Sequence, residues 1–113
     1  MPAYAVALIS EAREGLWIVS YLKQIDATLA LFGGRFIVHG ETPEVKEGHW
    51  TNTMVMIQFP DIDAARGWYD SPAYQAILPL RTGNSEGTVV LIDGTSSDHK
   101  GTDILPPELL AQA

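Results

Sequence analysis

The chain has 113 residues, 46% of them apolar, which fits one folded domain and excludes disorder over most of its length. Its formal net charge is −7, from 14 acidic and seven basic residues, so a nucleic-acid backbone, which needs clustered lysine and arginine, is not expected as a partner. The absence of cysteine excludes disulfides, thiolate metal sites and a cysteine nucleophile.

The first third of the sequence predicts a strand followed by a helix. Residues from Ala3 to Ile9 (AYAVALI) form a short apolar run that ends in polar residues, as buried strands do. From about Glu14 to Phe32 the apolar residues recur at steps of four and three, which predicts a helix with one buried stripe. The stripe consists of Ile18, Leu22, Ile25, Leu29 and Phe32. Gly33 then suits the left-handed conformation that closes a helix.

Two strands joined by a polar connection are expected next. The segment Arg35 to Gly40 (RFIVHG) predicts the first, and Thr53 to Phe59 (TMVMIQF) predicts the second. Residues 41–51 between them are rich in glycine, proline and acids, so the pair is predicted to be a long hairpin.

The last third predicts an interrupted helix and a final strand. Asp61 is placed to cap the helix through its side-chain oxygen. Ser71 and Pro72 restart it, serine as the cap and proline in the first turn, and Pro79 is expected to weaken or end it. The segment Gly87 to Asp93 (GTVVLID) is the predicted last strand.

This order predicts an α+β, ferredoxin-like fold, β-α-β-β-α-β, with a four-stranded antiparallel sheet over residues 1–94. Both helices then cover one face, while residues such as Val6, Met56 and Ile92 leave the other face apolar. A bare patch of this size exceeds what a monomer usually exposes, so a homodimer is expected. The tail, residues 95–113, is predicted to be either flexible or docked on the partner subunit.

The amino-terminal sequence lacks a basic stretch followed by a long apolar run, and no apolar run approaches the ~20 residues that cross a bilayer. We therefore expect a cytoplasmic protein without a membrane partner.

Three segments resemble the family called domain of unknown function 1330, a branch of the dimeric α/β-barrel superfamily. They are Tyr21 with the helix into GGRFIVHG, then FPDIDAARGWYDSPAYQAILPLR, and the closing EGTVVLIDG. The resemblance covers nearly all of residues 3–94, although Glu41 stands where relatives often carry a second glycine. It implies a dimer whose two sheets form a barrel. Characterised branches of the superfamily include small-molecule monooxygenases, haem-degrading enzymes and lactone isomerases, whereas this branch has no established reaction, and fold alone does not assign one.

Two residues of the second strand are the candidate catalytic groups. A period of two places Arg35 and His39 on one face and Phe36 and Val38 on the other, which suits the helices, so Arg35 and His39 are expected to face the dimer cavity. An imidazole there can act as a general base, and a guanidinium can hold a carboxylate. The alternative is that Arg35 forms an ion pair at the rim and that His39 is a hydrogen-bonded interface residue.

Six further residues are candidates for substrate binding: Tyr4, Tyr21, Gln58, Trp68, Tyr74 and Arg81. Arg81 suits an anion anchor at the carboxyl end of the second helix, where its charge also matches the helix dipole. Trp68 equally suits core packing, Tyr74 equally suits a buried hydroxyl with a partner, and Gln58 is a polar residue in an apolar strand.

Three functional hypotheses stay open. The first is a metal-independent enzyme, monooxygenase- or isomerase-like, that acts on a small, partly apolar, carboxylated molecule with His39 as base and Arg35 or Arg81 as anchor. The second is a small-molecule or haem-binding protein in which His39 ligates the iron, and the third is a structural dimer without a ligand. No metal site is expected, because His49 and His99 show no ligand spacing with His39.

Overall fold

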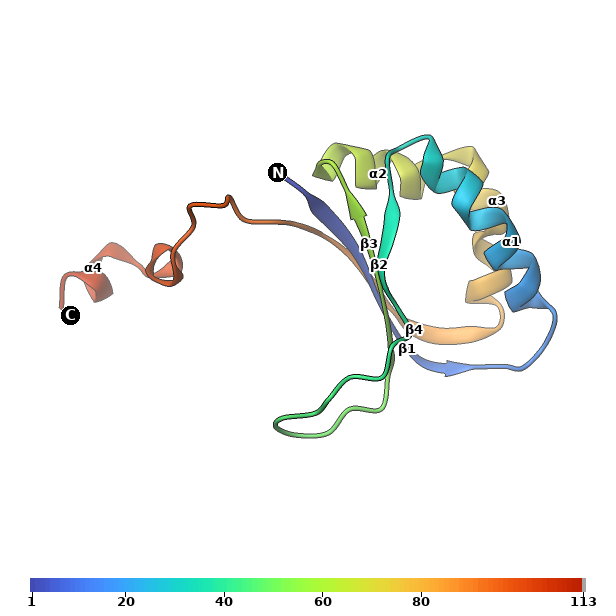
Figure 1. Cartoon of the computed structure of the whole chain (residues 1–113), viewed down its shortest axis with the longest axis horizontal. Helices are drawn as coiled ribbons and strands as arrows, with labels where there is room; N and C mark the ends of the chain where they lie inside the picture. Colours follow the sequence, from blue (N-terminus) through green and yellow to red (C-terminus); the bar gives the residue numbers. More distant parts are fainter. Residues whose placement is uncertain (113) are drawn as a thin grey trace.

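The computed structural model describes residues 1–112 and has one four-stranded antiparallel sheet in the order β2-β3-β1-β4. The strands are β1 (Ala3–Ala12), β2 (Arg35–His39), β3 (Thr53–Phe59) and β4 (Ser85–Asp93). Three helices, α1 (Trp17–Ala30), α2 (Ile62–Asp70) and α3 (Pro72–Thr82), cover one face of this sheet, as Figure 1 shows. The predicted α+β, ferredoxin-like fold is confirmed, with the second helix in two parts.

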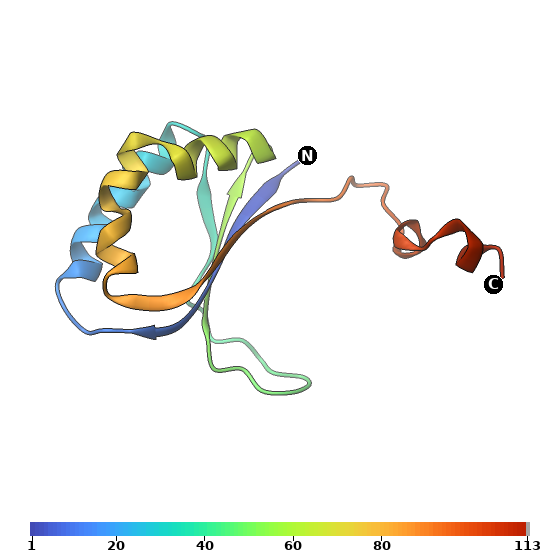
Figure 2. The same cartoon turned by 180° about the vertical axis from the view of Figure 1, so that it is seen from behind.

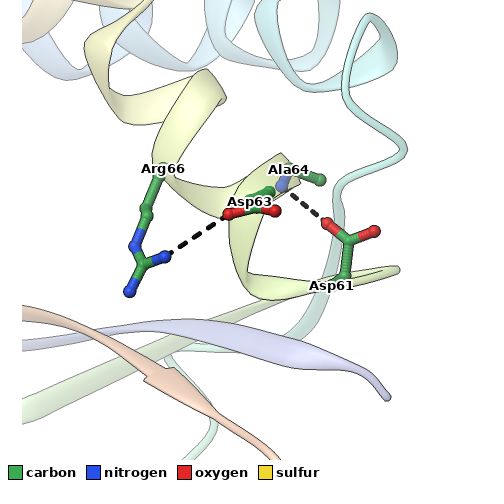
Figure 3. Close-up of polar contacts among 4 residues, drawn as sticks. All are labelled: Asp61, Asp63, Ala64 and Arg66. Carbon is green, nitrogen blue, oxygen red and sulfur yellow. Dashed lines mark hydrogen bonds and ion pairs between the residues drawn. The ribbon is translucent and has the colours of Figure 1, made fainter.

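The caps predicted for α2 and α3 are present. At the start of α2 the backbone N–H of Ala64 donates to Asp61 Oδ1 at 2.7 Å, and Arg66 pairs with Asp63 at 3.4 Å (Figure 3). At the start of α3 the N–H of Tyr74 donates to Ser71 Oγ at 3.2 Å. The side chains that satisfy free N–H groups therefore divide one helical pattern into two helices.

Pro79 does not end the helix, because α3 continues to Thr82. A proline interrupts a helix by removing one N–H donor and by crowding the turn before it. Its own carbonyl remains a good acceptor, and here it receives the N–H of Gly83 at 2.9 Å. The last turn therefore closes beyond the proline and brings Arg81 into a helical position.

Helix α1 ends as predicted. Gly33 has φ of +68°, the left-handed conformation that glycine adopts without strain. The next N–H, from Gly34, donates back to the carbonyl of Leu29 at 3.1 Å. A Cβ added at Gly34 would lie 2.7 Å from the ring of Phe59, so the chain also needs glycine there to enter β2 closely against β3.

The core lies between the sheet and the helices. Its centre contains Phe59 and Leu29, both fully buried, and Trp68, whose indole N–H donates to Thr28 Oγ1 at 2.9 Å. The predicted stripe of α1 is only partly correct. Ile18 and Leu22, which belong to the stripe, are 38% and 37% exposed, whereas Tyr21 and Thr28, which do not, are buried. Ile18 and Leu22 are exposed because the amino-terminal half of α1 spans a cavity and not a packed core.

The opposite face of the sheet carries large apolar side chains and no helix. Val90 and Ile92 are 47% and 53% exposed. The strand register places Val6 between Met56 and Val90 on the same face. Figures 1 and 2 show from both sides that α1 to α3 leave this surface, which we call the bare face, uncovered.

Two segments project from the body. The connection between β2 and β3 extends beyond the sheet, and the tail leaves the end of β4 and runs away from the other elements (Figure 2). The tail contains a 3₁₀ turn, Gly101–Ile104, and a short helix, α4 (Pro107–Leu110), without a buried residue. Within residues 1–112, no helix has both the length and the apolar character needed to cross a membrane.

Candidate functional site

A cavity of about 320 Å³ lies between the helix-covered face of the sheet and helices α1 and α3. Its floor comes from the strands, including Ala7, Val55 and Val89, and the helices add both aromatic and aliphatic side chains. The aromatic residues that line it are Trp17, Tyr21, Phe36, Trp68 and Tyr74. The volume is at the lower end of the range for small-molecule sites, and an apolar lining with a few polar groups is typical of them.

The polar groups of the cavity gather at one wall. The hydroxyls of Tyr21, from α1, and Tyr74, from α3, lie 2.7 Å apart and form a buried hydrogen bond. Arg81 lines the same cavity and is half-buried. It lies seven residues after Tyr74 on α3, so the two side chains share one face of the helix. We call these three residues the Tyr–Tyr–Arg cluster.

Burial and neighbouring charges shift the acidities of this cluster. Burial raises the pKa of the Tyr21 phenol, the nearby Tyr74 adds to the rise, and Arg81 opposes it. Burial by itself lowers the pKa of Arg81, but the oxygens of Tyr74 and Tyr21 outweigh it and the pKa rises. At physiological pH the Tyr21 phenol is therefore neutral and Arg81 is a guanidinium cation.

Among residues 1–112, no carboxylate forms an ion pair with Arg81. Within residues 1–112 the ion pairs join Lys46 to Glu44, Arg66 to Asp63 and His99 to Asp103, and none of them includes Arg81. This is notable in a chain with 14 acidic residues. One of the two phenols donates its hydrogen to the other, so the hydrogen of the accepting phenol remains available to a ligand. The cluster thus offers donors and positive charge to an anion.

His39 lines the same cavity, although its predicted orientation was wrong. The ladder between β2 and β3 contains an irregularity at Ile37: Phe36 pairs with Ile57, and His39 pairs with Val55. Such a bulge inserts one extra residue and reverses the alternation after it. Phe36 and His39 therefore share the helix-covered face, where their rings stack with centroids 4.1 Å apart and planes 7° apart.

Arg35 lies on the other side of the sheet. It pairs with Gln58, which also pairs with Tyr4, and all three point to the bare face because their neighbours Ile57 and Ala5 are in the core. The sequence candidates therefore divide into two groups. His39, Tyr21, Trp68, Tyr74 and Arg81 meet at the cavity, whereas Arg35, Gln58 and Tyr4 form a separate polar row on the bare face.

The family profile described as Domain of unknown function (DUF1330) matches residues 2–95. The chain belongs to this family. No match was found among curated protein sequences.

Solved structures show that the DUF1330 chain shares its fold with several proteins. A dimeric ferredoxin-like protein of unknown function from Jannaschia sp. CCS1 has a TM-score of 0.63 at 12% identity, covering 83% of this chain and 100% of its own. A protein of unknown function from Rhodopseudomonas palustris has a TM-score of 0.62 at 14% identity, covering 84% and 83%. SnoaB, a cofactor-independent oxygenase from Streptomyces nogalater, has a TM-score of 0.54 at 17% identity, covering 88% and 97%. These likenesses concern the fold alone.

Sequence reasoning missed part of the DUF1330 cavity. Trp17 and Phe36 line it, yet nothing in their local pattern marks them as more than core residues. The spacing of seven between Tyr74 and Arg81 was a usable signal, because two helical turns bring such residues to one face. Their meeting with Tyr21 depends on the packing of α1 against α3, which local sequence does not encode.

The donor set at the cavity suits an organic ligand better than a metal or a haem. Among residues 1–112 no three histidine or acidic side chains come together as metal ligands. The one imidazole of the cavity lies flat against Phe36, and the volume favours a ligand smaller than a porphyrin. The lining of this cavity therefore does not fit a haem.

Proposed function

We propose that this protein is a homodimeric, metal-independent enzyme that acts on a small, partly apolar, carboxylated molecule in the cavity between sheet and helices. The observation that carries the proposal is the half-buried Arg81, which lies beside two phenols and has no carboxylate partner within residues 1–112. A positive charge held in an apolar cavity favours an anionic ligand, since the ligand supplies the missing counter-charge.

In this proposal the Tyr–Tyr–Arg cluster holds the carboxylate. The guanidinium donates in a fork that matches the two oxygens of a carboxylate, and the free phenolic O–H donates a further hydrogen bond. The apolar lining of the cavity takes the hydrocarbon part of the ligand and excludes water from it.

His39 is proposed as the general base. Histidine is the side chain that serves most often as a general base, and its imidazole can take a proton from the bound molecule. The bulge at Ile37 supports this role because it places the ring on the cavity side of β2. A fold shared with a cofactor-independent oxygenase is compatible with proton-transfer chemistry that uses no metal.

Homodimerisation is supported by the bare face. Val90 and Ile92 expose about half of their surface there, and a contiguous apolar patch on a sheet is expected to pair with a partner. A structure with the same fold is described as dimeric. In this assembly Arg35, Gln58 and Tyr4 lie at the subunit interface.

Calorimetric titration with small carboxylic acids and with their neutral amides tests the proposal. Wild type is expected to bind the acids and not the amides. A hydrogen-bonded charge contributes about 1.5–3 kcal/mol, so Arg81→Gln should weaken acid binding by about 10- to 150-fold. Arg35→Gln removes the same charge from the bare face and is the matched control, expected to bind as wild type does. Equal binding of acids and amides, or equal effects of the two variants, would contradict the proposal.

The haem-binding hypothesis has its own test. Purified protein titrated with haem is expected to show no Soret shift that depends on His39. A shift that is present in wild type and lost in His39→Ala would establish the binding hypothesis in place of the enzymatic one.

A further inference from the structure

The first half of strand β1 has small residues toward the helices and large ones toward the bare face. Its residues alternate between the two faces, as in any strand. The helix-facing positions hold Ala3, Ala5 and Ala7, followed by the larger Ile9, and the positions between the alanines hold Tyr4, Val6 and Leu8. Protein interiors are close-packed, so side chains normally fill the space between a sheet and its helices. Here the small side chains leave that space open.

The alanines differ in what covers them. Ala3 is fully buried and Ala5 nearly so, and α2 packs against β1. Ala7 pairs with Val55 on β3 and with Val89 on β4, and all three line the cavity. A methyl group between two valines on neighbouring strands makes a low, level floor. Any longer side chain at Ala7 would rise into the cavity from its centre.

Aromatic rings surround this floor on several sides, beside the aliphatic Ile18, Leu22 and Ile25 of α1. Trp17 and Tyr21 come from α1, Tyr74 from α3 and Phe36 from β2. Aromatic rings contact other rings favourably in stacked or edge-to-face arrangements, beyond the area that they bury. An alanine floor with rings on several sides therefore suits a flat molecule better than a thick one.

We infer that the ligand is a planar ring carboxylate, with one ring or two fused rings, and that Ala7 determines which rings fit. This inference rests on the proposed function, because the Tyr–Tyr–Arg cluster must hold the carboxylate while the ring lies over Ala5 and Ala7. The cavity volume of about 320 Å³ accommodates such a molecule.

The test compares two acids with the same carbon skeleton and different thickness. The probes are 2-naphthoate, which is flat, and decahydronaphthalene-2-carboxylate, its saturated counterpart, titrated calorimetrically into the full chain. Wild type is expected to bind the flat acid at least tenfold more tightly. Ala7→Leu should weaken naphthoate binding at least tenfold and should reduce benzoate binding less, because the smaller ring can move away from the added methyls.

The control variant is Ala27→Leu, which adds the same atoms at an exposed position of α1 outside the cavity. It should bind both probes as wild type does. If Ala7→Leu fails to fold by circular dichroism, Ala7→Val supplies a smaller change, and its naphthoate affinity should fall by a smaller factor in the same direction.

The outcomes separate the two proposals. If acids bind through Arg81 but Ala7→Leu and Ala7→Val bind naphthoate as wild type does, or the saturated acid binds as tightly as the flat one, the ring inference is wrong and the proposed function stands. If no acid binds to wild type, or if Arg81→Gln changes nothing, both are wrong.

Discussion

The two faces of this sheet are both largely apolar, but they differ in the size of the side chains that β1 presents to them. The covered face has alanines on β1 and a cavity with the Tyr–Tyr–Arg cluster beside it. The bare face has valine, leucine, methionine and isoleucine side chains and a polar row of Arg35, Gln58 and Tyr4. A face that is to receive a small molecule needs space within it, whereas a face that is to receive a protein partner needs side chains that fill a common core. On β1, side-chain size and not hydropathy distinguishes the two faces.

The largest effect is expected from removing the base of the covered face. Phenylpyruvate, a partly apolar acid with an acidic benzylic C–H, should exchange that hydrogen faster in D₂O when the protein is present. General-base catalysis contributes about 10²- to 10⁴-fold, so His39→Gln should lower the catalysed exchange, followed by proton NMR, by at least the lower factor. The control His99→Gln changes the tail and should leave the rate unchanged. Full exchange activity in His39→Gln would remove His39 from the proposed mechanism.

The next effect concerns the bare face. Val90→Lys places a charge in the middle of the expected subunit interface, where it must be desolvated without a partner. The dimer dissociation constant from analytical ultracentrifugation should rise at least tenfold. Val45→Lys introduces the same charge at a valine of nearly equal exposure, 49% against 47%, on the projecting hairpin. If both variants, or neither, shift the equilibrium, the bare face is not the interface.

A smaller effect is expected on stability, from a buried hydrogen bond beneath the helices. Trp68→Phe removes the indole N–H that donates a hydrogen bond to Thr28 Oγ1 at 2.9 Å. This change should lower the free energy of unfolding by about 1–3 kcal/mol in denaturant titrations. Trp50→Phe is the matched control, because the buried indole N–H of Trp50 has no hydrogen-bond partner within residues 1–112. That change should leave stability unchanged or raise it. A larger loss of stability in Trp50→Phe than in Trp68→Phe would contradict this assignment.

The smallest effect is one of pH. Burial raises the pKa of Tyr21 above its usual value of about 10, so above that pH the unfolded chain releases a proton that the folded chain still holds. The stability associated with Tyr21 is therefore present below pH 10 and is lost as the pH rises. Denaturant titrations of wild type between pH 10 and 11 should show a steeper fall than those of Tyr21→Phe, by at most about 1.4 kcal/mol per pH unit. Parallel curves would contradict the burial of this phenol.

What could be predicted from the sequence were features set by local rules. Gly33 ends α1, and Asp61 and Ser71 begin α2 and α3, because each acts on backbone groups within a few residues of itself. The order of these elements was enough for the fold. The residues that α1 would bury were predicted only in part, since the cavity beneath Ile18 and Leu22 depends on alanines in a distant strand.

The candidate site was predicted as a set of residues but not as an arrangement. A regular period of two places Arg35 and His39 together, and only the pairing of β2 with β3 reveals the extra residue that separates them. Likewise, Tyr21 and Tyr74 lie 53 positions apart in the chain, and the sequence around neither residue indicates that their hydroxyls form a hydrogen bond. Contacts between elements decide both cases.

The bulge that turns His39 inward also affects the margin of the sheet. Strand β2 is an edge strand, and the free N–H and C=O groups of such a strand can template the addition of a strand from another chain. A bulge bends and twists that row of groups, so a flat incoming strand cannot follow it. One additional residue at position 37 thus protects this edge against aggregation, and stacking between molecules would have to begin from β4 on the far side.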